Sequence, residues 1–251
     1  MEKGILKISQ NKKVSFLRAF KLFLVKLLLI SSFAYASSGF QGVASRHHIA
    51  TDIGLKVLKN GGNAIDAAVA VGFALSVVNP SAGNLGGGGF MIIHLSEKNE
   101  TIAIDYRERA PIQSSEKMFQ DQDGNVINGL SLNSTLASGV PGTVSGMFYV
   151  SEKFGLKNIK SLINPSVEIA KKGFVLSKFQ ANNLNKYKEK FLKNPEAKEI
   201  FTRPEGFAEG DILIQKNLAN TLSRIAKNGK EEFYLGETAK KISSFYKRNK
   251  G

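Results

Sequence analysis

The 251-residue chain contains no cysteine and no tryptophan. The absence of cysteine excludes disulfide bonds, thiol nucleophiles, thiolate-bound metal sites and a lipoprotein anchor. Acidic residues are scarce too, because 21 Asp and Glu stand against 35 Lys and Arg, which gives a formal net charge of +14. With 42% of its residues apolar, the chain has enough material for one large domain or two small ones.

The positive charge is concentrated in two parts of the chain. Residues 1–36 carry a net charge of +6 and residues 151–251 a net charge of +10, whereas residues 37–150 carry −2. In the C-terminal part the lysines are interspersed with 11 acidic residues and form no continuous basic stripe. This distribution indicates a solvated surface rather than a nucleic-acid-binding face.

The N-terminal segment has the three parts of a secretory signal peptide. A basic stretch precedes the apolar run Leu22–Phe33, and the small residues of Ala34-Tyr35-Ala36 follow it. A membrane anchor is the alternative, but the apolar run is shorter than the roughly 20 residues that a membrane span needs. We expect residues 1–36 to be removed after Ala36 and a single domain over 37–251 to be exported to the periplasm or the medium.

Capping residues and apolar periodicity predict the first elements of the mature chain. A short strand over 42–44 should precede a helix that has Thr51 as its N-cap and ends near Leu58. Asn63 should cap a second helix over 64–78. That helix is apolar on nearly every side, which predicts that it is buried in a layered core.

The rest of the chain predicts one β-hairpin followed by amphipathic helices. Strands are expected over 90–95 and 101–106, with a polar, turn-rich segment over 111–140. Helices are then predicted at 143–154, 165–172, 177–192, 216–226 and 237–247. This order of elements is typical of an α/β (α+β) layered architecture.

The glycine-rich segment 83–89 does not fit a nucleotide-binding loop. A dinucleotide fingerprint requires a strand, a glycine loop and then a helix, whereas here a helix comes before the loop and a strand after it. The chain also has no phosphate loop ending in Gly-Lys-Ser/Thr. The glycines are therefore expected either to allow close packing or to leave backbone amides free to line a pocket.

Arg107 is the candidate binding residue. It follows the predicted strand 101–106, and a planar guanidinium at a strand end can hold a carboxylate through two parallel hydrogen bonds. The alternative is an internal ion pair with Asp105 or Glu108.

The three histidines, His47, His48 and His94, support neither a catalytic triad nor a metal site. No Gly-x-Ser-x-Gly elbow is present, and no acidic residues stand at metal-ligand spacing beside the first two histidines. His94 lies in an apolar strand and is predicted to be a core residue. Asn99 and Asn133 each begin an Asn-x-Thr glycosylation pattern, which is a short and weak signal.

Several segments in the same order resemble the N-terminal part of gamma-glutamyltransferases, also called gamma-glutamyltranspeptidases or glutathione hydrolases. The segments that carry this resemblance are Gly61–Ala70, Gly86–Met91, Asp105–Pro111, Gly139–Gly142 and Gly210–Ile242. The resemblance implies an N-terminal-nucleophile hydrolase fold, a four-layer αββα sandwich that is incomplete in this chain. It also implies an exported precursor that cuts itself into two subunits.

The resemblance further implies a mechanism. A threonine at the new N-terminus attacks a γ-glutamyl amide such as glutathione, and its own α-amine serves as the base. The glutamyl group then passes through an acyl-enzyme to water or to an acceptor amine. No metal or organic cofactor is implied.

By the same resemblance, Arg107 matches the arginine that holds the α-carboxylate of the glutamyl substrate. Glu108 lies in the same motif, and from this position we expect it to orient Arg107. The nucleophilic threonine is expected beyond residue 251, so this chain should hold no catalytic residue and be inactive without the C-terminal region or small subunit. Two alternatives stay open. One is the same fold acting on polyglutamate or on a beta-lactam side-chain amide, and the other is a non-catalytic exported remnant or binding module.

Overall fold

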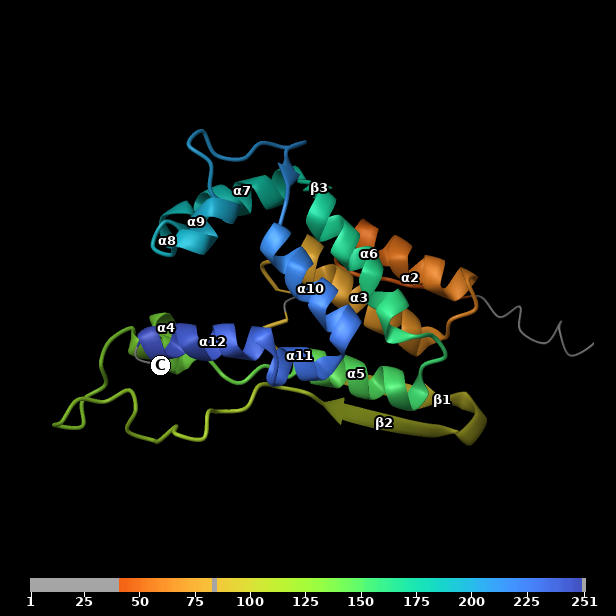
Figure 1. The fold of residues 1–251 in the computed structure, drawn as a ribbon, viewed down its shortest axis with the longest axis horizontal. Coiled ribbons are helices and arrows are strands. Elements are labelled where there is room, and N and C mark those ends of the chain that lie inside the picture. Colours follow the sequence, from red (N-terminus) through yellow and green to blue (C-terminus); the bar gives the residue numbers. More distant parts are fainter. Residues whose placement is uncertain (1–40, 83–84, 250–251) are drawn as a thin grey trace, which may run out of the picture. The chain divides into compact units, whose positions relative to one another are not determined.

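The computed structural model describes residues 41–82 and 85–249, so the expected signal peptide and its cleavage site after Ala36 lie outside the described residues. The described part is mainly helical and contains one β-hairpin and one very short pair of strands (Figure 1). None of its helices has the length and apolar character needed to span a membrane.

The bounds of the elements are as follows. The helices are α2 (His48–Lys59), α3 (Ala64–Val78), α4 (Leu130–Asn133), α5 (Thr143–Phe154), α6 (Ile159–Lys172), α7 (Lys178–Lys186), α8 (Lys188–Phe191), α9 (Pro195–Phe201), α10 (Lys216–Asn228), α11 (Lys230–Tyr234) and α12 (Glu237–Arg248). The strands are β1 (Phe90–Leu95), β2 (Glu100–Asp105), β3 (Phe174–Val175) and β4 (Ile212–Leu213). Short 3₁₀ turns occupy Ser96–Lys98 and Thr135–Ala137.

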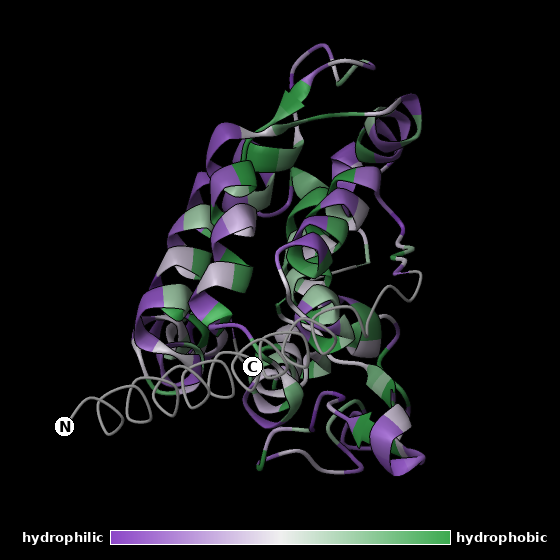
Figure 2. Cartoon of the chain, turned by 90° about the vertical axis from the view of Figure 1, so that its right-hand side faces the viewer, coloured by the Kyte–Doolittle hydropathy of each residue, from purple (hydrophilic) through white to green (hydrophobic). Residues whose placement is uncertain are grey.

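Helix α3 forms the centre of what we call the helical layer, which consists of α2, α3, α6 and α10. It packs against α2 and α6, and α6 in turn packs against α10 (Figure 1). Val69, Phe73 and Val77 of α3 have no exposed surface, which confirms that this apolar helix is buried. Figure 2 shows hydrophobic residues on the sides of the helices that face one another and hydrophilic residues on the outer sides.

The start of α3 is fixed by polar contacts at both a local and a long-range level. The Asn63 side chain accepts the Asp66 N–H, and the Asp66 carboxylate accepts the Asn63 N–H, which confirms the predicted cap. The same carboxylate is fully buried and accepts the backbone N–H groups of Leu156 and Lys157 at 3.1 Å. Asp66 therefore ties the start of α3 to the chain that leaves α5.

The predicted hairpin is present, with β1 and β2 antiparallel and Phe90 opposite Asp105. Its two faces differ strongly. Ile93 is buried against the core with 4% of its surface exposed, whereas Phe90 and Ile92 on the other face are 64% and 77% exposed. His94 shares this outer face, so the prediction that it is a core residue was wrong; its Nδ1 lies 3.1 Å from the Thr101 hydroxyl.

One predicted strand and the predicted starts of two helices were wrong. The strand over 42–44 does not form, and α2 begins at His48 because the His47 Nδ1 accepts the Ile49 N–H and caps the helix, a role assigned to Thr51. Helix α6 begins six residues before Pro165, at Ile159. The buried residues Leu162 and Ile163 of its first turns hold it helical despite the proline.

The C-terminal half contains more elements than were predicted. Helix α7 ends at Lys186, so the predicted helix 177–192 is divided at Tyr187 into α7 and α8. The short elements α9, α11, β3 and β4 were not predicted, because segments of two to seven residues give no periodic signal.

Candidate functional site

The candidate site is built around the backbone of Tyr106 and Arg107, where β2 ends. Tyr106 exchanges two hydrogen bonds with Gly89, and the next bridge joins Arg109 to Val140. These contacts hold the chain on both sides of Arg107, so that the arginine projects from a fixed backbone.

Two glycines press against the Tyr106–Arg107 peptide. A Cβ atom on Gly88 would lie 2.6 Å from the Tyr106 carbonyl oxygen, and a Cβ on Gly142 would collide with the same oxygen. The N–H of Gly142 also donates to the carbonyl of Gly87 at 2.8 Å. Of the two roles considered for the glycine-rich segment, close packing is therefore the one that Gly88 performs, and it does so directly behind Arg107.

The side chain of Arg107 is 65% exposed and only loosely paired. Its Nε lies 3.9 Å from the nearer carboxylate oxygen of Glu108, and its guanidinium carbon lies 5.8 Å from the centre of the Phe90 ring. The Asp105 carboxylate accepts the backbone N–H of Arg107 at 2.9 Å instead of pairing with the guanidinium. An exposed ion pair at this distance contributes little free energy, so the guanidinium can turn to a ligand.

Arg107 opens onto a cavity of about 650 Å³. The cavity is lined by Asp105, Tyr106, Arg107, Arg109, Tyr149 and Tyr234 and by residues 140–142, 145 and 146. Two guanidinium groups stand against one carboxylate in this lining, and that carboxylate is already bonded to a backbone amide. The cavity therefore favours an anionic ligand.

Sequence reasoning missed three residues of this cavity: Arg109, Tyr149 and Tyr234. The Tyr234 hydroxyl donates to the Pro141 carbonyl at 2.8 Å and accepts the Ser145 N–H at 3.1 Å. Burial raises the pKa of Tyr234, which keeps the phenol neutral and able to donate. Arg109 could have been found, because it lies two positions from Arg107 in an extended segment.

The histidines contribute nothing to this cavity. His47 and His48 stack on each other with ring centres 4.7 Å apart, and His94 lies on the outer face of β1. Within residues 41–82 and 85–249, no group of three or more His, Asp or Glu side chains could hold a metal ion.

Comparison with known proteins gives a consistent result. The family described as Gamma-glutamyltranspeptidase matches residues 50–251. Glutathione hydrolase proenzymes of Pseudomonas sp. (strain A14) and Escherichia coli (strain K12) are 47% and 46% identical over 211 residues, which is 83% of this chain and 36% of each relative. The crystal structure of Helicobacter pylori gamma-glutamyltranspeptidase superimposes with a TM-score of 0.82 and 45% identity, over 86% of this chain and 62% of that one. The chain thus spans about a third of the length of the curated relatives.

Proposed function

The chain belongs to the gamma-glutamyltranspeptidase family, and from this premise we propose that it forms the part of a glutathione hydrolase that binds the carboxylate of the substrate. Its fold class is the mixed α/β N-terminal-nucleophile hydrolase fold that the sequence predicted. In the proposed function Arg107 binds the α-carboxylate of a γ-glutamyl substrate such as glutathione.

The observation that supports this role is an exposed, only loosely paired guanidinium on a fixed backbone beside an electropositive cavity. A guanidinium can give two parallel hydrogen bonds to one carboxylate, which fixes both the position and the plane of the bound group. Glu108 lies too far from Arg107 for a hydrogen bond, at 3.9 Å, and its charge is placed to orient the guanidinium without occupying it.

In the proposed reaction Arg107 acts by positioning. With the α-carboxylate held, the γ-carbonyl of the substrate is presented to a nucleophile in a defined place, which lowers the entropic part of the barrier. We propose that this nucleophile is a threonine outside these 251 residues, in a C-terminal region or small subunit. Its α-amine takes the hydroxyl proton and passes it to the amine that leaves as the γ-amide C–N bond breaks, so the glutamyl group stays on the threonine as an ester. The glutamyl group then leaves the acyl-enzyme for water or an acceptor amine.

The proposal is tested by measuring glutamate release from glutathione. The purified chain alone should show background rates, and adding the C-terminal part of a proenzyme in trans should restore turnover. In that reconstituted enzyme Arg107→Ala should lower kcat/KM by about 10- to 100-fold, since a charge-assisted double hydrogen bond is lost. Arg248→Ala, at the exposed end of α12, serves as the matched control. Unchanged kcat/KM for Arg107→Ala, or an equal loss in both variants, would exclude the proposed role.

We also propose that the protein is exported with removal of residues 1–36, on the strength of the sequence pattern alone. Mass spectrometry of the protein recovered from the periplasm or medium should find Ser37 at its N-terminus. Recovery of a chain that begins at Met1, in the cytoplasmic fraction, would contradict this.

A further inference from the structure

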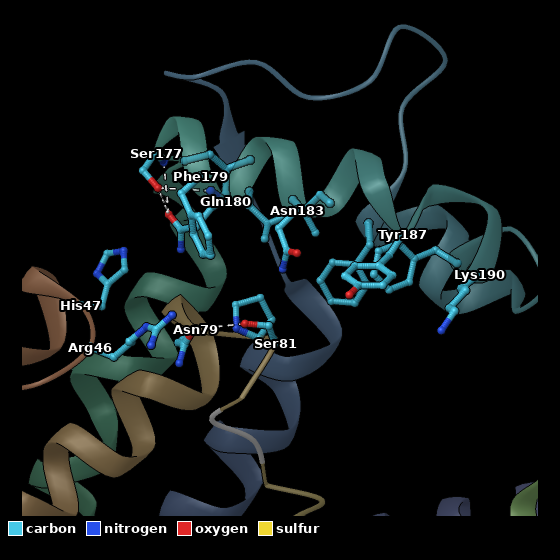
Figure 3. A pocket seen from close by; sticks show the side chains of 16 residues that line it. Arg46, His47, Asn79, Ser81, Ser177, Phe179, Gln180, Asn183, Tyr187 and Lys190 are labelled. Atoms are coloured by element: carbon cyan, nitrogen blue, oxygen red, sulfur yellow. Dashed lines mark hydrogen bonds between the residues drawn. The ribbon is translucent and has the colours of Figure 1, made fainter. Parts of the chain in front are cut away.

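A second cavity, of about 490 Å³, lies between the end of α3 and the helices α7 and α8 (Figure 3). It shares no lining residue with the cavity at Arg107. Its volume falls within the range of roughly 300–1,000 Å³ that is usual for small-molecule sites. Nothing in the proposed function uses it.

The walls of this cavity are held in place by side-chain amides. The Gln180 Nε2 donates to the carbonyl of Val78 at 2.8 Å, and its Oε1 accepts the Ser177 N–H at 3.1 Å. Gln215 donates in the same way to Val77, also at 2.8 Å. The carbonyls at the end of α3 are thereby bonded to α7 and to the start of α10, so the cavity is preformed rather than created by a ligand.

The lining of the cavity is rich in aromatic side chains, which suit a flat, apolar ligand. Phe179 and Tyr187 from α7 and its C-terminus face the cavity in Figure 3, and Phe191 and Phe201 complete this side with their ring centres 5.3 Å apart. Phe179 is 65% exposed although it lies beside a hydrophobic wall. Aromatic rings in this arrangement favour a planar ligand that can stack on them.

The charges of the lining have one sign. Arg46 and Lys190 line the cavity together with His47, and no Asp or Glu does. Neither cation makes an ion pair with any residue in the described part of the chain. Figure 3 shows Arg46 beside His47 on one side and Lys190 beyond Tyr187 on the other. Partial burial and the neighbouring His48 lower the pKa of His47, so the fixed charge on that side belongs to Arg46.

From these features we propose that the cavity binds a small organic anion with an aromatic body, that is, an aryl carboxylate. The rings take up the planar body, and Arg46 or Lys190 binds the carboxylate, with no acidic side chain in the lining to repel it. This site is independent of Arg107 and of the γ-glutamyl chemistry, so its test does not depend on catalytic activity.

The experiment compares two probes of nearly the same shape, one a carboxylate anion and the other the neutral amide. Binding of 2-naphthoate and of 2-naphthamide to the purified full chain is measured by ligand-observed NMR and calorimetry. We expect the carboxylate to bind about tenfold more tightly than the amide and this preference to shrink as salt is added. Equal affinity for the two probes, or no binding of naphthoate up to its solubility limit, would overturn the proposal.

Variants then locate the site. The double substitution Arg46→Gln/Lys190→Gln should abolish the preference for naphthoate, whereas Lys178→Gln/Lys227→Gln removes the same charge from side chains outside the lining and should preserve it. Phe179→Ala should weaken both probes alike. All these side chains are exposed, so the variants are expected to fold. Retention of the preference in the first pair, or its loss in both pairs, would exclude this cavity as the binding site.

Discussion

The helical layer differs from the hairpin region, which consists of β1, β2 and residues 106–109. Large apolar side chains and the carboxylate of Asp66 are buried in the helical layer, whereas an apolar face and the Arg107 guanidinium are exposed in the hairpin region. In the helical layer the large apolar side chains are covered, and Phe73 has no exposed surface. In the hairpin region one whole face is open, with Ile92 77% exposed. Polar groups follow the same division: Asp66 is saturated by backbone donors, whereas the Arg107 guanidinium is loosely held.

This contrast separates stability from binding. Saturated polar groups of the helical layer such as Asp66 cannot be offered to a ligand without unfolding, because they already accept or donate the hydrogen bonds that their burial requires. The hairpin region contributes less to the core and keeps a charge accessible. Substitutions should therefore lower the free energy of unfolding most in the helical layer, less at contacts between elements, and least on the open face of the hairpin.

The largest effect is expected for Asp66→Ala. The substitution leaves the backbone N–H groups of Asn63, Leu156 and Lys157 without their buried acceptor. We expect the free energy of unfolding to fall by about 3–5 kcal/mol, measured by urea denaturation. Asp52→Ala, on the exposed side of α2, is the matched control and should change it by less than about 0.5 kcal/mol. Similar losses at both positions would show that Asp66 is not a structural tie.

Asp66 also shows how far the sequence could lead. Its capping of α3 was predictable, because Asn63 and Asp66 stand three residues apart before an apolar run. Its bonds to Leu156 and Lys157 join positions 90 and 91 residues apart, and no local pattern encodes such a contact. Local signals likewise gave α3 and the hairpin correctly, but they chose Thr51 over His47 as a cap because histidine seldom has that role.

The candidate site divides in the same way. Arg107 could be found from its motif, and the packing of Gly88 behind it was one of two roles considered. Tyr234 could not be assigned to the same cavity, because it approaches Pro141 from α11, 93 residues away in sequence. The outer position of His94 was missed because alternation along a strand does not say which of its two faces is covered.

A smaller effect than that of Asp66→Ala is expected at Glu232, which joins the helical layer to α12. Its carboxylate accepts bonds from Arg224 Nε at 2.8 Å and from the Thr238 hydroxyl at 2.9 Å. Burial alone would raise the pKa of Glu232, but these hydrogen bonds outweigh it and lower the pKa to about 2. Glu232→Gln should lower the free energy of unfolding by about 2 kcal/mol at neutral pH, measured by thermal denaturation. Glu231→Gln, at an exposed position, is the control.

The pH dependence of this effect has a definite sign. Because the folded pKa lies below the ordinary value of 4.5, the ionised carboxylate contributes its stability above pH 4.5 and loses it as the pH falls toward 2. The difference in stability between the wild-type chain and Glu232→Gln should therefore shrink across that interval. A difference that stays constant from pH 7 to pH 2 would contradict the assignment.

A smaller effect is expected for Tyr234→Phe, which breaks the contact between α11 and the wall of the Arg107 cavity. The lost hydroxyl donates to Pro141 and accepts from Ser145, so the cost should be about 1 kcal/mol. Hydrogen exchange should speed up at Ser145 more than in α3, because the damage is local. Tyr246→Phe on α12 controls for loss of a phenol, and equal exchange at Ser145 in both variants would argue against a local role.

The smallest effect is expected on the open face of the hairpin, and it tests the contrast most directly. Ile92→Thr replaces a side chain that is 77% exposed, so it should change the free energy of unfolding by less than about 0.5 kcal/mol. Ile93→Thr, its neighbour on the covered face, should cost about 2–3 kcal/mol because it buries a hydroxyl and leaves a void. The measurement is urea denaturation of both variants at the same protein concentration.

Comparison of Ile92→Thr with Ile93→Thr shows whether the outer face of the hairpin is exposed to solvent in solution. If Ile92→Thr is nearly neutral at every protein concentration, the face contacts only water, and the contrast between the two regions holds for the free chain. If its cost approaches that of Ile93→Thr and grows with protein concentration, a second copy covers the face, since binding that favours the folded state adds stability by mass action. The outer residues of β1 would then belong to an interface, and the exposure of Arg107 beside them would have to be measured again in the assembled protein.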